Sequence, residues 1–204
     1  MRARRGEWLA RAGARATVVF GLATAPAALA QSAHPPDRGP QHMARDFSTY
    51  QPTAVATRIG AGEAPQIDGD VSDAVWAKAP VIDEFYQLEP QEGAPGSERT
   101  VVRVLYDADN LYFAIHAFDR EPEKVTASIK ARDGNLSQDD LFRIYLDPYM
   151  SRRDGYVFEV NPLGARADAL VQNNTTFLIE WNTIWSAKAR RVADGWMAEV
   201  AIPF

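Results

Sequence analysis

Paired carboxylates are the first feature of this sequence that could support catalysis, because two Asp or Glu side chains can act as acid and base in glycoside hydrolysis. The stretch 139–161 starts with Asp139 and Asp140, and it places Asp147 and Glu159 on either side of a polar loop. Adjacent residues of a strand point to opposite faces, so Asp139 and Asp140 do not form a pair there. Nothing in the sequence sets the distance from Asp147 to Glu159. The pattern therefore favours acids solvated at turns and strand edges over a catalytic pair.

Other catalytic signatures are missing from the sequence. It has no cysteine, which excludes disulfides, thiolate metal sites and cysteine nucleophiles. It contains no nucleophile elbow, phosphate-binding glycine loop or HExxH zinc motif. A catalytic triad would depend on His116, since His34 and His42 lie in a polar N-terminal stretch. We therefore expect no catalysis by this chain itself.

Aromatic residues in predicted loops indicate a different chemistry. A sugar presents an apolar C–H face and a rim of hydroxyls, so its binding site needs a flat aromatic ring beside hydrogen-bonding side chains. The alternative for each aromatic is core packing, which the sequence favours for Trp76 and Trp196. Six residues in or near two predicted loops form the candidate sugar site: Trp181, Trp185, Tyr149, Arg153, Asn173 and Asn174.

The segment 64–80 allows two interpretations. Asp68, Asp70 and Asp73 are closely spaced oxygen donors that predict a calcium site, but the further ligands of an EF-hand loop are missing. The other interpretation is a turn at Asp68–Asp70 followed by a short helix near 72–79, with Ser72 as the N-cap. The sequence favours the turn and cap.

Alternating apolar residues predict an all-β fold, an antiparallel β-sandwich of jelly-roll type with one short helix near 72–79. Runs of alternating residues, separated by Asp, Asn and Gly turns, are typical of strands in two packed sheets. The predicted strands are 55–59, 100–106, 111–118, 125–130, the two strands of a hairpin within 139–161, 166–172, 185–192 and 195–202.

The N-terminal residues have the pattern of an export signal. Residues 1–30 combine arginines, a short apolar run and Ala28-Leu29-Ala30, which predicts a signal peptide cut after Ala30; an uncleaved anchor is the alternative. Residues 31–54 are predicted to be a flexible tether, and 55–204 the sandwich. Removing residues 1–30, which carry five Arg and one Glu, changes the net charge from −5 to −9. This charge excludes nucleic acid as a partner. We expect an exported protein that is periplasmic, associated with the outer membrane or extracellular.

Five segments over residues 55–204 resemble the family 9 carbohydrate-binding modules in their order: IDGDVSDAVW, VRVLYDADNLYFAIHAFD, DDLFRIYLDP, GYVFEVNPLG and DGWMAEVAIPF. The resemblance implies a β-sandwich that binds sugars, commonly at chain ends, is appended to glycoside hydrolases and can carry structural calcium. Sugar-binding members hold the ligand between two loop tryptophans; here Trp181 is one candidate, with Trp185 or Tyr149 as its partner. The ending most resembles a variant at the N-terminus of large bacterial outer-membrane proteins.

The resulting prediction is non-catalytic binding of a poly- or oligosaccharide, as an accessory to polysaccharide catabolism. A chain truncated at its C-terminus would lack a catalytic domain, such as an O-glycosyl hydrolase, or an outer-membrane barrel. One alternative is a structural N-terminal domain of a barrel protein without a sugar site. Another is an electron-transfer sandwich that binds haem b through Met150, Met197 or His116. Apart from structural calcium, the main interpretation needs no cofactor.

Overall fold

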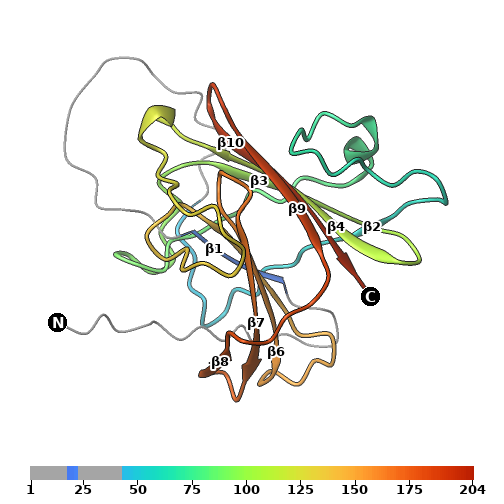
Figure 1. Cartoon of the computed structure of the whole chain (residues 1–204). Helices are drawn as coiled ribbons and strands as arrows, with labels where there is room; N and C mark the ends of the chain where they lie inside the picture. The colour runs from blue at the N-terminus through green and yellow to red at the C-terminus, as the bar shows by residue number, and fades with distance from the viewer. Residues whose placement is uncertain (1–17, 23–42) are drawn as a thin grey trace.

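A computed structural model of the 204-residue chain describes residues 18–22 and 43–204, with only the backbone of the first segment. The described strands form two sheets that pack face to face (Figure 1). Sheet A has the order β1-β5-β6-β7-β8, and all its neighbouring strands are antiparallel. Its strands are β1 (Val18–Leu22), β5 (Phe142–Leu146), β6 (Gly155–Val160), β7 (Arg166–Gln172) and β8 (Thr176–Leu178).

Sheet B has the order β2-β3-β4-β10-β9 and is antiparallel except for the short parallel pair β2–β3. Its strands are β2 (Thr57–Arg58), β3 (Thr100–Tyr106), β4 (Asn110–Phe118), β9 (Ser186–Val192) and β10 (Gly195–Pro203). Two short 3-10 helices, η1 (Ala74–Lys78) and η2 (Pro122–Lys124), complete the described elements. The predicted all-β sandwich is confirmed.

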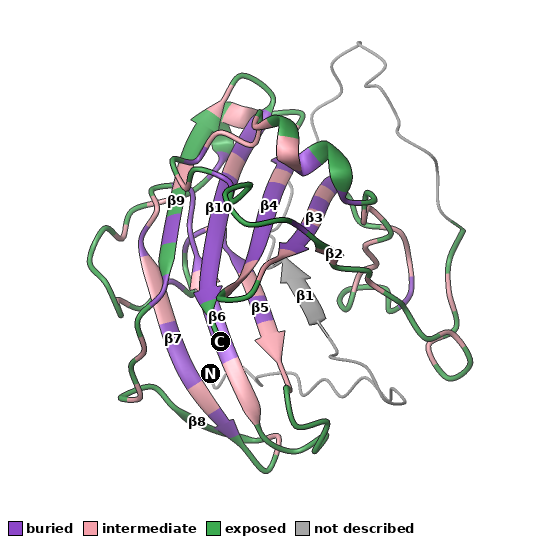
Figure 2. Ribbon diagram, turned by 90° about the vertical axis from the view of Figure 1, so that its right-hand side faces the viewer, coloured by how far each residue is buried: buried purple, intermediate pink, exposed green. Residues whose placement is uncertain are grey.

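The core lies between the facing surfaces of the two sheets. In Figure 2 the central strands of sheet B are almost continuously buried. Because side chains alternate along a strand, every second residue of each inner strand enters this core. The predicted inward positions are confirmed, and the main contributors are Val102, Val104, Phe113, Ile115, Phe142, Ile144, Phe158, Val160, Trp196, Ala198 and Val200.

Two local predictions are wrong. Residues 125–130 do not form a strand, because the backbone N–H groups of Ser128 and Ile129 donate to the Asp139 carboxylate instead of to a strand partner. The predicted short helix near 72–79 is present as η1, but Ser72 is not its N-cap, because the helix starts at Ala74 and Asp73 occupies the N-cap position. The Ser72 N–H donates to the Asp70 carboxylate, which keeps Ser72 in the preceding turn.

Glu199 joins the turn before η1 to sheet B. It lies on the outer face of β10, where the sequence predicts an outward side chain, but it is fully buried. Its carboxylate accepts hydrogen bonds of 2.9 Å from the backbone of Asp68 and Gly69 and from Trp76 Nε1. Burial raises the pKa of Glu199, and these donors oppose that rise. The three bonds hold segment 66–78 on the sheet.

Part of the predicted tether contacts the sandwich. Arg45 donates hydrogen bonds from its backbone N–H to the Gly93 carbonyl and from its Nε to the Tyr86 hydroxyl, and the Tyr50 hydroxyl donates to Glu84.

Strand β1 lies within the predicted signal peptide and pairs with β5, so cleavage after Ala30 would leave β5 at the edge of sheet A. Within the described residues, no helix has the length and hydropathy needed to cross a bilayer.

Candidate functional site

A row of apolar side chains crosses the inner face of sheet A at one end of the strands. Leu146, Tyr156, Leu170 and Leu178 are register partners on β5, β6, β7 and β8, on the same face as the core residue Phe158. Figures 1 and 2 both show the ends of β6 and β7, with β8, projecting beyond sheet B. Since sheet B does not cover this end, three of the four residues are half-buried and Leu178 is exposed. We call these four residues, with Tyr149 and Trp181, the apolar shelf.

Trp181 and Tyr149 supply aromatic rings beside Tyr156. The rings of Trp181 and Tyr156 lie 5.1 Å apart and are tilted by 40°, and Phe158 supports Trp181 from the core. The backbone N–H of Trp181 donates to the carbonyl of Leu178, which ties it to β8. Tyr149 is 77% exposed. Burial, followed by the charge and the hydrogen bond of the nearby Tyr149 hydroxyl, raises the pKa of Tyr156.

The β5–β6 loop carries Tyr149 in a constrained conformation. Asp147 accepts hydrogen bonds from the backbone N–H groups of Ser151 and Arg152 and so organises the loop. Met150 and Arg152 both have positive φ, at 53° and 58°. Such backbone strain in residues other than glycine is often found at functional sites. Asp147, which the sequence offers as half of a carboxylate pair, is therefore a loop-organising residue here.

The β7–β8 turn brings the predicted polar residues to the same end of sheet A. Asn173 and Asn174 have φ of 51° and 64°, and two consecutive positive values are typical of a type I′ hairpin turn. The Arg153 guanidinium donates to the side-chain oxygen of Asn173, and the Asn174 N–H donates to the carbonyl of Arg153 at 2.8 Å. The Asn173 N–H donates to Asp154. These three predicted residues form one margin of the shelf.

Trp185 does not lie on the shelf. It is only 2% exposed, its ring packs edge-on against Phe158 at 5.2 Å, and its Nε1 donates to Asp168. The structure places it in the core because β9 starts at Ser186 and carries the chain across to sheet B. Of the two tryptophans predicted for the site, only Trp181 is partly accessible.

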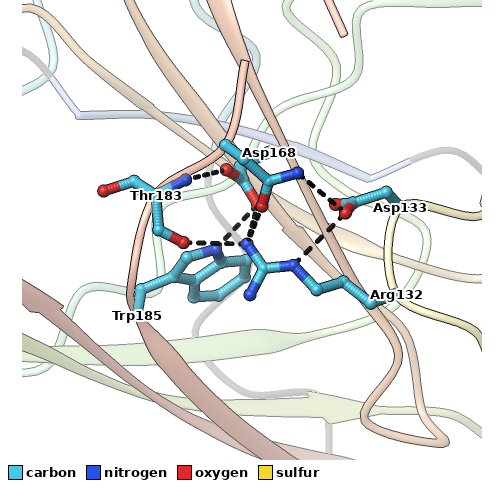
Figure 3. Close-up of polar contacts among 6 residues, drawn as sticks. Arg132, Asp133, Asp168, Thr183 and Trp185 are labelled. Atoms are coloured by element: carbon cyan, nitrogen blue, oxygen red, sulfur yellow. Dashed lines mark hydrogen bonds and ion pairs between the residues drawn. The ribbon is translucent and has the colours of Figure 1, made fainter. Parts of the chain in front are cut away.

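A polar network holds the loop that carries Trp181 (Figure 3). The Asp168 side chain, which is fully buried, accepts from Arg132 Nη2 at 2.9 Å, from Trp185 Nε1 at 3.0 Å and from the Thr183 N–H at 2.8 Å. The same Arg132 nitrogen donates to the Thr183 carbonyl and the Asn182 side chain. Loop 179–185 is thereby fixed to β7. The only signal in the sequence is an aspartate at an inward position of a strand.

The remaining acids of the stretch 139–161 have structural roles. Asp139 is buried, contrary to the expected solvation, and it accepts from Ser128, Ile129 and Asn161. Burial favours its neutral form, but the donated hydrogen bonds outweigh that effect and lower its pKa. Glu159 forms an ion pair with Arg143 on the outer face of sheet A.

The pKa of Asp140 shifts in the opposite direction from that of Asp139. Burial raises it, although the Asp140 carboxylate accepts a hydrogen bond from the Thr126 N–H.

The three aspartates of the calcium prediction are engaged separately. Asp68 accepts from the Asp70 N–H, Asp70 pairs with Arg190, and Asp73 accepts from the Gln66 N–H. Within the residues that the structure describes, no three His, Cys, Asp or Glu side chains are grouped to hold a metal ion. The structure therefore does not bring these three ligands together.

The three candidate haem ligands are not placed to bind the two sides of one haem iron. His116 and Met197 are cross-strand neighbours on the outer face of sheet B, while Met150 is in the β5–β6 loop of sheet A. Cross-strand Cβ atoms are about 5 Å apart, too close for side chains that bind opposite sides of a haem iron. His116 instead stacks on Phe118 and contacts Asp194 at 3.1 Å. This geometry does not favour the haem alternative.

Comparisons with known proteins agree with this architecture. The fold is the β-sandwich of carbohydrate-binding modules: a family 9 module from Caldicellulosiruptor kristjanssonii in complex with cellotriose aligns with a TM-score of 0.53 and 20% identity over 74% of this chain and 68% of that one. Its complex with glucose aligns with a TM-score of 0.53 and 19% identity, covering 74% and 69%. A Bacteroides uniformis protein that is provisionally assigned to carbohydrate binding aligns with a TM-score of 0.56 and 11% identity. The alignment covers 72% of this chain and 71% of that one.

The sequence profile of the family described as "Carbohydrate family 9 binding domain-like" matches residues 67–204. The chain belongs to this family. No curated protein matches the chain significantly in sequence. At identities of 11–20%, the structural matches define the fold and leave the site to be argued from the residues of this chain.

Proposed function

We propose that this chain is a non-catalytic carbohydrate-binding module whose ligand lies on the apolar shelf. The observation that carries the proposal is the joint position of three aromatic rings and three polar side chains at the uncovered end of sheet A. Family membership supports carbohydrate as the ligand class. The engagement of Asp139, Asp147 and Glu159 in structural bonds supports a binding role rather than hydrolysis.

The chemistry of the shelf suits a sugar. Trp181, Tyr156 and Tyr149 offer ring surfaces to the C–H faces of pyranose rings. Arg153, Asn173 and Asn174 offer N–H donors and carbonyl acceptors to the hydroxyl rim. The type I′ turn holds Asn173 and Asn174, and Asp147 organises the loop that carries Tyr149 and Arg153. Because these residues are held before the ligand binds, little side-chain entropy is lost on binding.

Titration of the full chain with cello- and xylo-oligosaccharides, followed by tryptophan fluorescence and calorimetry, tests the proposal. We expect Trp181→Ala to weaken binding at least tenfold, which corresponds to about 1.4 kcal/mol. Trp181 also packs on Phe158, so Tyr149→Ala is the second variant: its side chain is 77% exposed and its loss leaves the core intact. Phe204→Ala, with the same exposed fraction on the last residue of the chain, is the matched control.

The outcomes separate binding from packing. Weaker binding by Tyr149→Ala with unchanged stability, and unchanged binding by Phe204→Ala, would support the shelf as the site. Absence of binding by the wild-type chain, or equal affinity of the wild type and both shelf variants, would refute it.

The cellular role is a further part of this proposal. The leader-like residues 1–30 support export to the periplasm, the outer membrane or the exterior, where the module would serve a glycoside hydrolase as an accessory. Fractionation of cells that produce the chain, with N-terminal sequencing of the product, tests export. An intact N-terminus in the cytoplasmic fraction would contradict it.

A further inference from the structure

The edges of the two sheets differ in how they are protected. Without β1, the strands that the structure describes leave β5 and β8 at the edges of sheet A, and β2 and β9 at those of sheet B. Strand β2 has two residues and β8 has three, while β9 carries the exposed Lys188, Arg190 and Arg191. Short strands and exposed charges both hinder edge-to-edge pairing. Strand β5 has five residues, and its one charged residue, Arg143, is paired with Glu159 at 2.5 Å. Among these four edges, that of β5 is therefore the unprotected one.

The β5 edge already accepts a strand in this structure. All five residues of β5 are register partners of β1 in an antiparallel ladder, from Phe142 opposite Leu22 to Leu146 opposite Val18. Because β1 belongs to the predicted leader, processing after Ala30 removes it and leaves the edge-facing backbone N–H and C=O groups of β5 without strand partners. Such a row of groups is a template for pairing with a strand of another chain.

The sequence of β5 is complementary to itself. Two antiparallel copies centred on Ile144 place Phe142 opposite Leu146 on the core side, so that apolar side chains meet. On the outer face the same register places Arg143 opposite Tyr145, once on each side of the two-fold axis. A guanidinium beside an aromatic ring is a favourable pair, and within one chain Arg143 already lies 6.0 Å from the centroid of the Tyr145 ring. No like charges face each other in this register.

We infer that the processed protein forms a two-fold dimer, in which β5 pairs with β5 of a second copy and sheet A continues across both subunits. This inference rests on the removal of the leader that we propose, and it is independent of sugar binding. Directly opposed residues of an antiparallel pair point to the same face, so the apolar shelves of both subunits open on one side of the joined sheet. Leu146, which belongs to the shelf, then lies beside Phe142 of the partner subunit.

The test compares the exported product, with its N-terminus sequenced, with the full chain 1–204 by analytical ultracentrifugation. We expect the exported product to dimerise and the full chain to remain a monomer, because β1 occupies the β5 edge in the full chain. A monomeric exported product at the highest soluble concentration would overturn the inference. Equal dimerisation of the full chain, or an exported product that retains residues 18–22, would also overturn it.

A charge at the interface gives the second readout. Tyr145→Lys places a cation opposite Arg143 on both sides of the two-fold axis, and we expect it to raise the dimer Kd at least tenfold. Phe177→Lys is the matched control, because Phe177 is the register partner of Val171 on the outer face at the other edge of sheet A. This variant and Tyr145→Phe, which keeps the ring, should dimerise like the wild type. A folded Tyr145→Lys that dimerises equally well would contradict the β5 interface.

Cross-linking reports the register, and it applies even where Tyr145→Lys fails to fold. The sequence has no cysteine, so introduced thiols are the only ones present. A mixture of Arg143→Cys and Tyr145→Cys chains, oxidised with diamide, should form a disulfide-linked dimer, because opposed residues of an antiparallel pair lie within the Cα distance that a disulfide spans. A mixture that links no faster than either variant alone would overturn the register.

Cellotriose titration of the same samples separates this inference from the proposed function. A monomeric product that binds the sugar would overturn the dimer and leave the proposed function standing. A dimer that binds no sugar would support the dimer and refute the proposed function.

Discussion

The bond between Arg132 and Asp168 offers the sharpest test of how the site is held. The change is Asp168→Asn, Arg132→Ala and the double variant. The asparagine keeps the shape of Asp168 and removes its charge. One oxygen can still accept from Arg132 and Trp185, but the new amide then faces the Thr183 N–H, whose acceptor is lost. The variants thus perturb loop 179–185 without opening a large cavity in the core.

The expected magnitudes follow from burial. One buried donor left without an acceptor costs about 1–3 kcal/mol, so we expect Asp168→Asn to lower the free energy of unfolding by about 2 kcal/mol. Breaking a fully buried ion pair costs about 3–5 kcal/mol. Arg132 is one-third exposed, so water solvates part of the gap and we expect about 2 kcal/mol for Arg132→Ala. Once position 168 is neutral, removing Arg132 costs less, which gives a coupling energy of about 1 kcal/mol or more.

Urea unfolding of the four proteins, followed by tryptophan fluorescence, measures this coupling. Arg190→Ala is the control, because Arg190 pairs with Asp70 on the surface and its loss should cost less than about 1 kcal/mol. Oligosaccharide binding, measured where each variant is fully folded, should weaken in Asp168→Asn because Trp181 loses its fixed loop. Additivity of the two single changes within about 0.5 kcal/mol would refute the network as a coupled unit.

Three further predictions concern the scaffold. Glu199→Ala leaves three donors without an acceptor and should lower the free energy of unfolding by about 3–5 kcal/mol in urea; a loss below about 1 kcal/mol would contradict its role. The lowered pKa of Asp139 means that its stabilisation is present above its ordinary value of about 3.9 and is lost as pH falls through the folded-state value, so the stability gap between wild type and Asp139→Asn should shrink on acidification. Gly195→Ala would place Cβ 2.1 Å from the Ala117 carbonyl at a φ of 140°, and thermal unfolding should show a loss of about 3 kcal/mol or more; an unchanged melting temperature would be inconsistent with this geometry.

Much of the fold was predictable because strand periodicity is a local property. Alternation alone locates five strands within about a residue and both strands of the hairpin 139–161, and it assigns Phe142, Phe158 and Trp196 to the core. It fails at 125–130, where a single buried carboxylate, Asp139, captures the backbone donors that a strand would use. The turn at Asn173 and Asn174 is also a local feature, because asparagine tolerates the positive φ that a type I′ turn requires.

The site depended on contacts between distant residues. The sequence by itself determined an all-β chain, its inward-facing residues and the polar loops beside Trp181. Only the tertiary structure decided that Trp185 is buried. It also decided that Arg132 pairs with Asp168, 36 residues away in the sequence, and that Glu199 accepts a hydrogen bond from the Gly69 N–H, 130 residues away. Whether a ring is buried or exposed depends on where the second sheet ends above it. That position follows from how two sheets pack, which residue spacing along one strand does not encode.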